Sequence, residues 1–254
     1  MSQKFKAGDP LNPYDPASVS LGQEGPEARL QAGTGPSKAL TDIMSDPSKM
    51  ARFMEMMKAD MEDAKRRGET MEERALREKR EWAEADGKAA KLKDDANKAF
   101  REGNYKEAFV LYSTCMEISP QEPVYRLNRA AAALKLTMYE TTIKDASSCL
   151  EDDYNIPKAY FRRSQARYSL GNLQEARQDL DKARAIQPAD PILIREAEIL
   201  SSLEAKSPEE LPAWVAEQGR KSLDDLFGQD GLEDLVKQRM TEAGINLDHQ
   251  YAIY

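Results

Sequence analysis

Between residues 89 and 190, the order of apolar, small and turn-forming residues repeats along the chain. The pair Gly103-Asn104 returns as Gly171-Asn172, 68 positions later, which is twice 34. Both residue types tolerate positive φ angles and therefore suit the turn between two short helices. A period of 34 residues accommodates one such helix pair and its connections. We therefore expect this region to be all-α and built from repeated helix pairs.

The period divides the region into three helix pairs. They are expected at residues 89–122, 123–156 and 157–190. In the first pair, the pattern predicts helix A near residues 91–102 and helix B near residues 105–118. The last pair of such an array exposes an apolar flank, so residues 191–204 are expected to add a capping helix. The region 89–204 should thus hold seven helices and no strand.

The segment after the repeats, residues 205–254, carries weaker signals. The sequence Ser-Pro-Glu-Glu from Ser207 is typical of a helix start. Two further short helices are expected over residues 222–227 and 232–240, and the end from residue 245 should be loose. Apolar residues of these helices could dock on the repeats or on a partner, and the pattern leaves both open.

The segment before the repeats divides into two parts. Residues 1–46 contain repeated Gly and Pro and no apolar period, so we expect them to be disordered. Residues 47–88 are predicted to form a charged amphipathic helix with interleaved signs, and Gly87 offers a joint before the first repeat. One face of this helix is apolar: Met50, Phe53, Met54, Met57 and Met61. This face could pack internally or receive a partner helix.

Composition narrows the class of protein. The 254 residues include 32% charged and 7% aromatic residues, which is poor for one large core but sufficient for stacked helices. The net charge of −8 argues against nucleic-acid binding. No apolar run is long enough for a membrane span, and the N-terminus lacks the apolar region of a signal peptide. Cys115 and Cys149 lie one repeat apart and should be buried thiols, which favours a cytoplasmic location.

The residues that enzymes and metal sites require are sparse. The single histidine, His249, lies near the end of the chain, without the surrounding residues of a catalytic site. No glycine-rich phosphate loop and no spaced Cys or His pair occurs. The sequence therefore predicts neither an enzyme nor a cofactor or metal site.

Polar residues on the first helix of each repeat form the most informative pattern. Lys93 and Asn97 are four residues apart and share one helix face, as do Lys158 and Arg162. Asn128 lies early in the first helix of the second repeat. Stacking the three helices would gather these donors, three of them cationic, in one groove. Such a groove suits a peptide with several carboxylates, including a free C-terminus, although the five could also be ordinary solvated residues.

The 34-residue unit resembles the tetratricopeptide repeat (TPR), and the donors resemble the two-carboxylate clamp of TPR co-chaperones. The matching stretches are KLKDDANKAF, LNRAAAALK and KAYFRRSQA. This resemblance implies a TPR solenoid of three helix pairs plus a capping helix. It further implies that Lys93, Asn97 and Asn128 hold the terminal carboxylate of a peptide. Lys158 would bind the last Asp side chain, and Arg162 would support the peptide upstream.

The resemblance predicts a function for the chain. TPR co-chaperones of this kind bind the acidic EEVD tail of cytosolic heat-shock chaperones of the 70- and 90-kDa classes. The chain would then be a non-enzymatic adaptor that links such a chaperone to an unknown client, without binding nucleic acid or membrane. The alternative is a TPR scaffold subunit of a multiprotein complex. The stretch FMEMMKADMEDAKRR gives that alternative a weaker resemblance to axonemal dynein assembly factors.

Overall fold

The computed structural model describes residues 46–229 and 231–245, and every regular element in these ranges is a helix. The helices are α3 (Pro47–Arg67), α4 (Met71–Arg101), α5 (Tyr105–Ile118), α6 (Pro123–Lys135), α7 (Tyr139–Glu151), α8 (Ile156–Ser169), α9 (Leu173–Ile186), α10 (Pro191–Glu204), α11 (Glu210–Gln218), α12 (Leu223–Phe227) and α13 (Gly231–Glu242). None of the described helices is long and apolar enough to cross a membrane. The predicted all-α class is confirmed.

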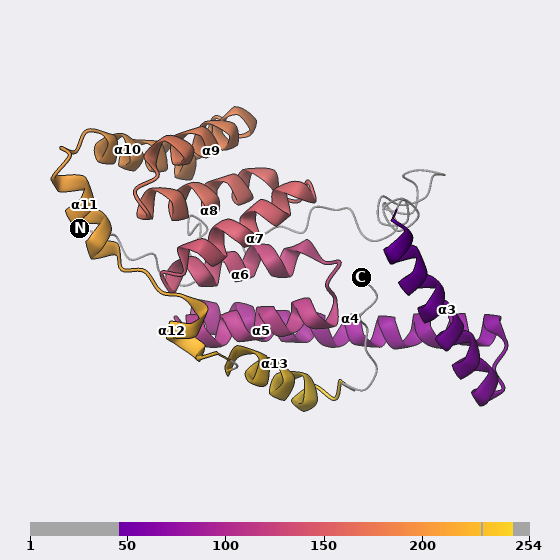
Figure 1. Cartoon of the computed structure of the whole chain (residues 1–254). Helices are drawn as coiled ribbons and strands as arrows, with labels where there is room; N and C mark the ends of the chain where they lie inside the picture. The colour runs from indigo at the N-terminus through magenta and orange to yellow at the C-terminus, as the bar shows by residue number, and fades with distance from the viewer. Residues whose placement is uncertain (1–45, 230, 246–254) are drawn as a thin grey trace. The chain divides into compact units, whose positions relative to one another are not determined.

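Consecutive helices from α5 to α10 pack against each other in chain order, so the array is a solenoid of helix pairs (Figure 1). The first helices of the pairs, called A helices here, are the end of α4 and all of α6 and α8. The second helices, called B helices, are α5, α7 and α9. Helix α10 packs against α9 as the predicted cap. Two successive A helices, α6 and α8, also contact each other.

The repeat appears in the core as a ladder of small residues. Ala96, Ala130 and Ser164 stand 34 positions apart on successive A helices, and each is fully buried. Small side chains allow helix axes to approach closely, while large neighbours such as Phe109 and Tyr112 fill the remaining space. This pattern of small and large positions explains how a chain with few aromatic residues can bury a continuous core.

Two of the three turns between A and B helices use glycine. Gly103 and Gly171 have φ angles of +82° and +84°, the left-handed region that glycine enters without steric cost. The second repeat places Thr137 at the equivalent position, with φ of +60°. A β-branched residue in this region costs on the order of 1 kcal/mol or more. The second turn is therefore strained, where the first and third are relaxed.

The segment expected to be one charged helix over residues 47–88 is two helices. Helix α3 ends before Gly68, whose φ of +69° breaks the helix, and α4 then starts at Met71. Helix α4 continues through Gly87 into the first repeat, so the joint expected there is absent. A single glycine costs a helix only about 1 kcal/mol, which packing of the flanking turns offsets.

The apolar face predicted for this segment is only partly described. Met54 and Met61 on α3 are exposed, while the side chains of Phe53 and Met57 lie outside the described residues. Opposite charges four residues apart support the start of α4, as in the pair Arg74–Glu78 at 2.6 Å. The N-terminal segment that was expected to be disordered and the last nine residues also lie outside the described ranges.

The C-terminal segment docks on the repeats of its own chain, which settles the alternative that the sequence left open. Residues 207–245 are called the C-terminal strap here. The strap first contacts the third repeat, where the ring centroids of Trp214 and Tyr168 are 6.2 Å apart. The strap then meets the turn of the second repeat, where the Lys221 amide donates to the Thr137 carbonyl at 3.1 Å. At the first repeat, Phe227 stacks on Phe109 at 5.6 Å.

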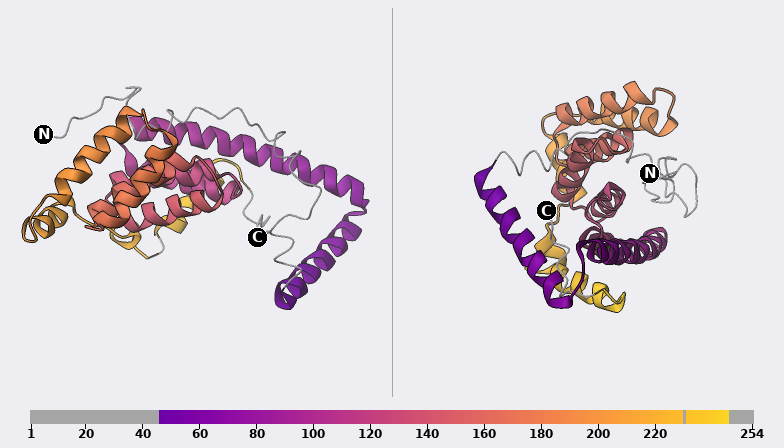
Figure 2. Two further views of the ribbon diagram at one scale, coloured as in Figure 1. Left: turned by 90° about the horizontal axis from the view of Figure 1, so that it is seen from above. Right: turned by 90° about the vertical axis from the view of Figure 1, so that its right-hand side faces the viewer.

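The end of the strap covers the outer side of the first repeat. Helix α13 packs against α5, on the side away from α6 (Figures 1 and 2). Ile245, expected in the loose tail, is instead buried against Ala85, Ala89 and Cys115. The Lys88 ammonium donates to the Gly244 carbonyl at 2.9 Å and fastens this end. The solenoid is thus capped by α10 at one end and by α13 at the other.

Candidate functional site

The five predicted donors come from three A helices. Lys93 and Asn97 lie one turn apart on α4, Asn128 lies on α6, and Lys158 and Arg162 lie one turn apart on α8. We call these five residues the donor set. Lys93, Asn97 and Lys158 are half-buried, whereas Asn128 and Arg162 are each only 1% exposed. The sequence predicted a groove of accessible donors, and two of the five are instead buried in this structure.

Arg162 reaches from α8 towards α6. Its Nη1 group donates to the carbonyl oxygen of Leu127, the residue before Asn128. Its Nη2 group is buried and has no hydrogen-bond partner among the described residues. Burial lowers the pKa of Arg162 to about 10, because a charged guanidinium loses its hydration. The group still carries its charge at neutral pH, so an anion beside it would be stabilised.

Asn128, the residue after the Leu127 acceptor, adds a second unsatisfied atom. Its amide oxygen Oδ1 is buried and accepts no hydrogen bond from the described residues. Native proteins rarely leave buried polar atoms without partners, and each exception calls for an explanation. A charged donor and a neutral acceptor on adjacent helices match the carboxylates and the N–H groups of a peptide.

Tyr112 of α5 interacts with one donor of α4 and one donor of α8. Its hydroxyl donates to Oδ1 of Asn97 at 2.7 Å, and the tyrosine itself is fully buried. Tyr112 also lies close enough to Arg162 to interact with it electrostatically. Donors from α4 and α8, together with the Leu127 carbonyl of α6, therefore meet around one buried residue. Lys93 and Lys158 extend this cluster by one helical turn on α4 and α8.

A repeated ion pair, which was not predicted from the sequence, fastens neighbouring helices to each other. Arg129 of α6 forms two bonds to Asp145 of α7, at 2.8 and 2.7 Å. Arg163 of α8 forms two bonds to Asp179 of α9, both at 2.8 Å. The arginines also donate to serine hydroxyls of the preceding B helices, Ser113 at 3.4 Å and Ser147 at 2.9 Å.

These pairs hold three helices together in each case, and their partners are already satisfied. The two arginines, the two aspartates and the two serines are each 34 positions apart. That spacing was visible in the sequence and could have identified the pairs as structural. They are therefore distinct from the donor set, whose buried members hold atoms without a partner in the described part of the chain.

Glu196 of the cap occupies the position 34 residues after Arg162. It accepts hydrogen bonds from the Tyr168 hydroxyl at 2.5 Å and from Nε2 of Gln165 at 3.0 Å. Burial nevertheless raises the pKa of Glu196 above its ordinary value. This carboxyl ties the cap to α8.

The two cysteines behave as small buried residues. Cys115 and Cys149 are free, and their thiols donate to the carbonyls of Ala89 at 3.3 Å and Pro123 at 3.7 Å. Burial raises the pKa of each thiol to about 12, so neither is a thiolate at neutral pH. No group of three or more His, Cys, Asp or Glu side chains that could hold a metal occurs within residues 46–229 and 231–245.

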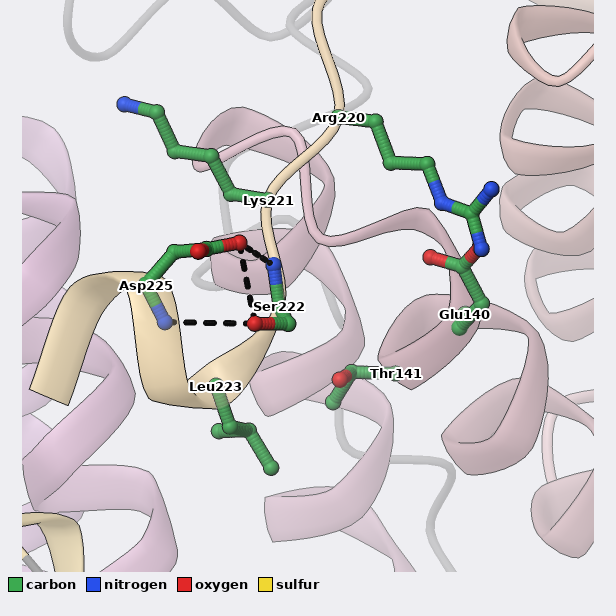
Figure 3. Close-up of a pocket in the computed structure, with 7 residues that line it drawn as sticks. All are labelled: Glu140, Thr141, Arg220, Lys221, Ser222, Leu223 and Asp225. Carbon is green, nitrogen blue, oxygen red and sulfur yellow. Dashed lines mark hydrogen bonds and ion pairs between the residues drawn. The ribbon is translucent and has the colours of Figure 1, made fainter. Parts of the chain in front are cut away.

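A shallow hollow of about 340 Å³ lies elsewhere, between the C-terminal strap and α7 (Figure 3). It is lined by Glu140, Thr141, Arg220, Lys221, Ser222, Leu223 and Asp225. Arg220 pairs with Glu140 across it, and Ser222 and Asp225 cap the start of α12. Because these polar groups bind each other, the hollow is a joint of the strap and does not include the donor set.

Comparison with known proteins identifies the repeat. The family model for the tetratricopeptide repeat matches residues 157–190. The chain is 33% identical over 148 residues to RNA polymerase II-associated protein 3 of Rattus norvegicus, which covers 56% of this chain and 22% of that protein. It is 35% identical over 106 residues to small glutamine-rich tetratricopeptide repeat-containing protein 2 of Mycosarcoma maydis, covering 42% and 30%.

A third relative carries an enzymatic name. Serine/threonine-protein phosphatase 5 of Homo sapiens is 32% identical over 109 residues, covering 42% of this chain and 22% of the phosphatase. The chain therefore spans between about a fifth and a third of the length of these curated relatives. Among solved structures, the first TPR of Spaghetti (RPAP3), bound to the HSP90 peptide SRMEEVD, is 32% identical with a TM-score of 0.45. It covers 47% of this chain and 95% of that one.

Proposed function

We propose that this chain, whose residues 157–190 are a tetratricopeptide repeat, is a non-enzymatic cytoplasmic adaptor. The donor set binds the acidic C-terminal tail of cytosolic heat-shock chaperones of the 70- and 90-kDa classes. The remaining surfaces of the chain link the chaperone to a client protein.

The observation that supports this proposal is a pair of buried polar side chains, Asn128 of α6 and Arg162 of α8, that each keep an atom without a hydrogen-bond partner among the described residues. Within residues 46–229 and 231–245, the Nη2 group of Arg162 has no acceptor and Oδ1 of Asn128 has no donor. A peptide tail rich in carboxylates supplies both kinds of group. Charge-assisted hydrogen bonds of this kind contribute about 1.5–3 kcal/mol each, so a few of them suffice for micromolar binding.

Each donor has a distinct role in this proposal. Lys93, Asn97 and Asn128 hold the terminal carboxylate, and Lys158 holds the last Asp side chain. Arg162 supports the peptide upstream, and its guanidinium is anchored to the Leu127 carbonyl. Replacing Arg162 should therefore cost stability as well as binding, whereas the half-buried Lys158 can be truncated with less damage to the fold.

Calorimetry with the peptide SRMEEVD in two forms tests the proposal. The free acid should bind with a Kd on the order of micromolar, and amidation of its C-terminus should weaken binding at least tenfold. Lys158→Ala should also weaken binding of the free acid about tenfold or more. Lys144→Ala removes the same charge from an exposed position on α7 and should leave the Kd unchanged.

Two outcomes would overturn the proposal. Equal affinity for the free acid and the amide would mean that the donor set does not bind a terminal carboxylate. Equal effects of Lys158→Ala and Lys144→Ala would mean that only the net charge of the chain matters. Either result would leave the array as a scaffold without a carboxylate site.

A further inference from the structure

We infer that Tyr112 is a positioning residue of the carboxylate site, whose buried hydroxyl fixes the Asn97 amide with its amino group directed towards the peptide. This inference rests on the proposed function. It concerns a residue of a B helix, which lies beneath the A-helix donors and was not part of the donor set.

The geometry fixes the amide of Asn97 at one end. The Tyr112 hydroxyl donates to Oδ1 of Asn97 at 2.7 Å, a favourable length for an O–H···O hydrogen bond. Asn97 is half-buried, and its oxygen points to the fully buried tyrosine. The amino group Nδ2 therefore occupies the more accessible end of the side chain. A carboxylate needs a donor, and this orientation presents one.

Arg162 supports the direction of that hydrogen bond. An asparagine amide could in principle turn over and donate to the tyrosine oxygen instead. The guanidinium of Arg162 lies within electrostatic range of Tyr112, and a nearby positive charge favours the lone pairs of the tyrosine oxygen. The hydroxyl proton is then directed away from Arg162, towards Asn97. The buried cation thus selects the amide orientation that suits an anionic ligand.

The repeat indicates that packing alone does not require the hydroxyl. The positions equivalent to Tyr112 in the second and third repeats are Ala146 and Leu180, both fully buried. An apolar residue therefore serves the packing of a B helix at this position. The hydroxyl occurs in the first repeat, where Asn97 lies above it. The position of the hydroxyl therefore favours a role in orienting Asn97 over a role in core packing.

A double-mutant cycle with two peptides tests the inference. Tyr112→Phe keeps the ring and removes the hydroxyl, and it should weaken binding of free-acid SRMEEVD about fivefold, as expected for one hydrogen bond. The same variant should leave the Kd of the amidated peptide unchanged. In an Asn97→Ala background, Tyr112→Phe should have no further effect on the free acid, because Tyr112 acts through Asn97. A merely structural role would weaken both peptides and both backgrounds alike.

A second measurement does not depend on peptide binding. In the free protein, Tyr112→Phe should shift and exchange-broaden the side-chain amide signals of Asn97 in a ¹H–¹⁵N spectrum, because the amide loses its fixed orientation. Unchanged Asn97 signals, or an undiminished effect of Tyr112→Phe in the Asn97→Ala background, would overturn the inference. Failure of the parent protein to prefer the free acid would instead overturn the proposed function, so the two failures are distinguishable.

Discussion

Replacing Arg129 with methionine should destabilise the solenoid more than the same change at Arg163. The two arginines occupy equivalent positions, and each makes a two-bond ion pair with a buried aspartate. Each guanidinium also lies 5.5 Å from an aromatic ring, so this contribution cancels between the two. The difference between the sites lies in what remains after the arginine is removed.

The magnitude follows from the partners of the two aspartates. Asp145 is 2% exposed, and Arg129 is its one ion-pair partner among the described residues. Asp179 is 1% exposed and keeps a second partner, Arg167, at 2.5 Å. Removing the partner of a buried charge costs about 3–5 kcal/mol. We therefore expect a loss of about 3 kcal/mol for Arg129→Met and about 1 kcal/mol for Arg163→Met.

Urea unfolding, followed by circular dichroism at the helical band, measures both changes. The midpoint of unfolding should fall further for Arg129→Met, and the double change Arg129→Met with Asp145→Leu should recover much of the loss. Equal losses at both positions would refute the reasoning, because they would show that the second partner of Asp179 contributes nothing. A failure of the double change to recover stability would show that the pair itself is required.

Two further predictions concern the cap and the strap. Burial places the folded-state pKa of Glu196 above its ordinary value of 4.5, so its favourable contribution is present below about pH 4.5 and is lost as pH rises through the folded pKa. Glu196→Gln should therefore raise the thermal midpoint at pH 7 and change it little at pH 4, as differential scanning fluorimetry can measure; an equal effect at both values would contradict this sign. Phe227→Ala removes a partly buried ring that contacts Phe109 and Lys106. This change should lower the free energy of unfolding by about 2 kcal/mol. Amide hydrogen exchange should then become faster in α5 and not in α9. Equally faster exchange in both helices would show that the Phe227 contact does not stabilise the first repeat alone.

The 34-residue spacing predicted the helix pairs because it depends on local turns and on neighbours close in sequence. Gly103 and Gly171 mark turns by their own backbone freedom, so their role could be predicted without a structure. Gly87 could not be judged in this way. Gly87 lies inside α4 between Ala85 and Ala89, which pack with Cys115 of α5 and with Ile245 from the far end of the chain.

The donor set was predictable as residue types and spacings, but its burial was not. The i,i+4 spacing places Lys158 and Arg162 on one face of α8, and the structure agrees with this. The depth of Arg162 depends on the carbonyl of Leu127, which belongs to another helix. The role inferred for Tyr112 likewise depends on a contact between two helices. Contacts of this kind are a property of the stacked array and are invisible in one sequence.

Because α13 covers the first repeat, the first repeat cannot complete its packing until the C-terminal part of the chain has been synthesised. The Lys88 ammonium meets the Gly244 carbonyl across 156 residues. At a synthesis rate of about 5–20 residues per second, a ribosome needs roughly 8–30 s to add that stretch. During this interval the apolar flank of the first repeat has been made, but its cover has not. The first repeat therefore keeps this flank exposed to solvent and to other proteins until α13 emerges from the ribosome.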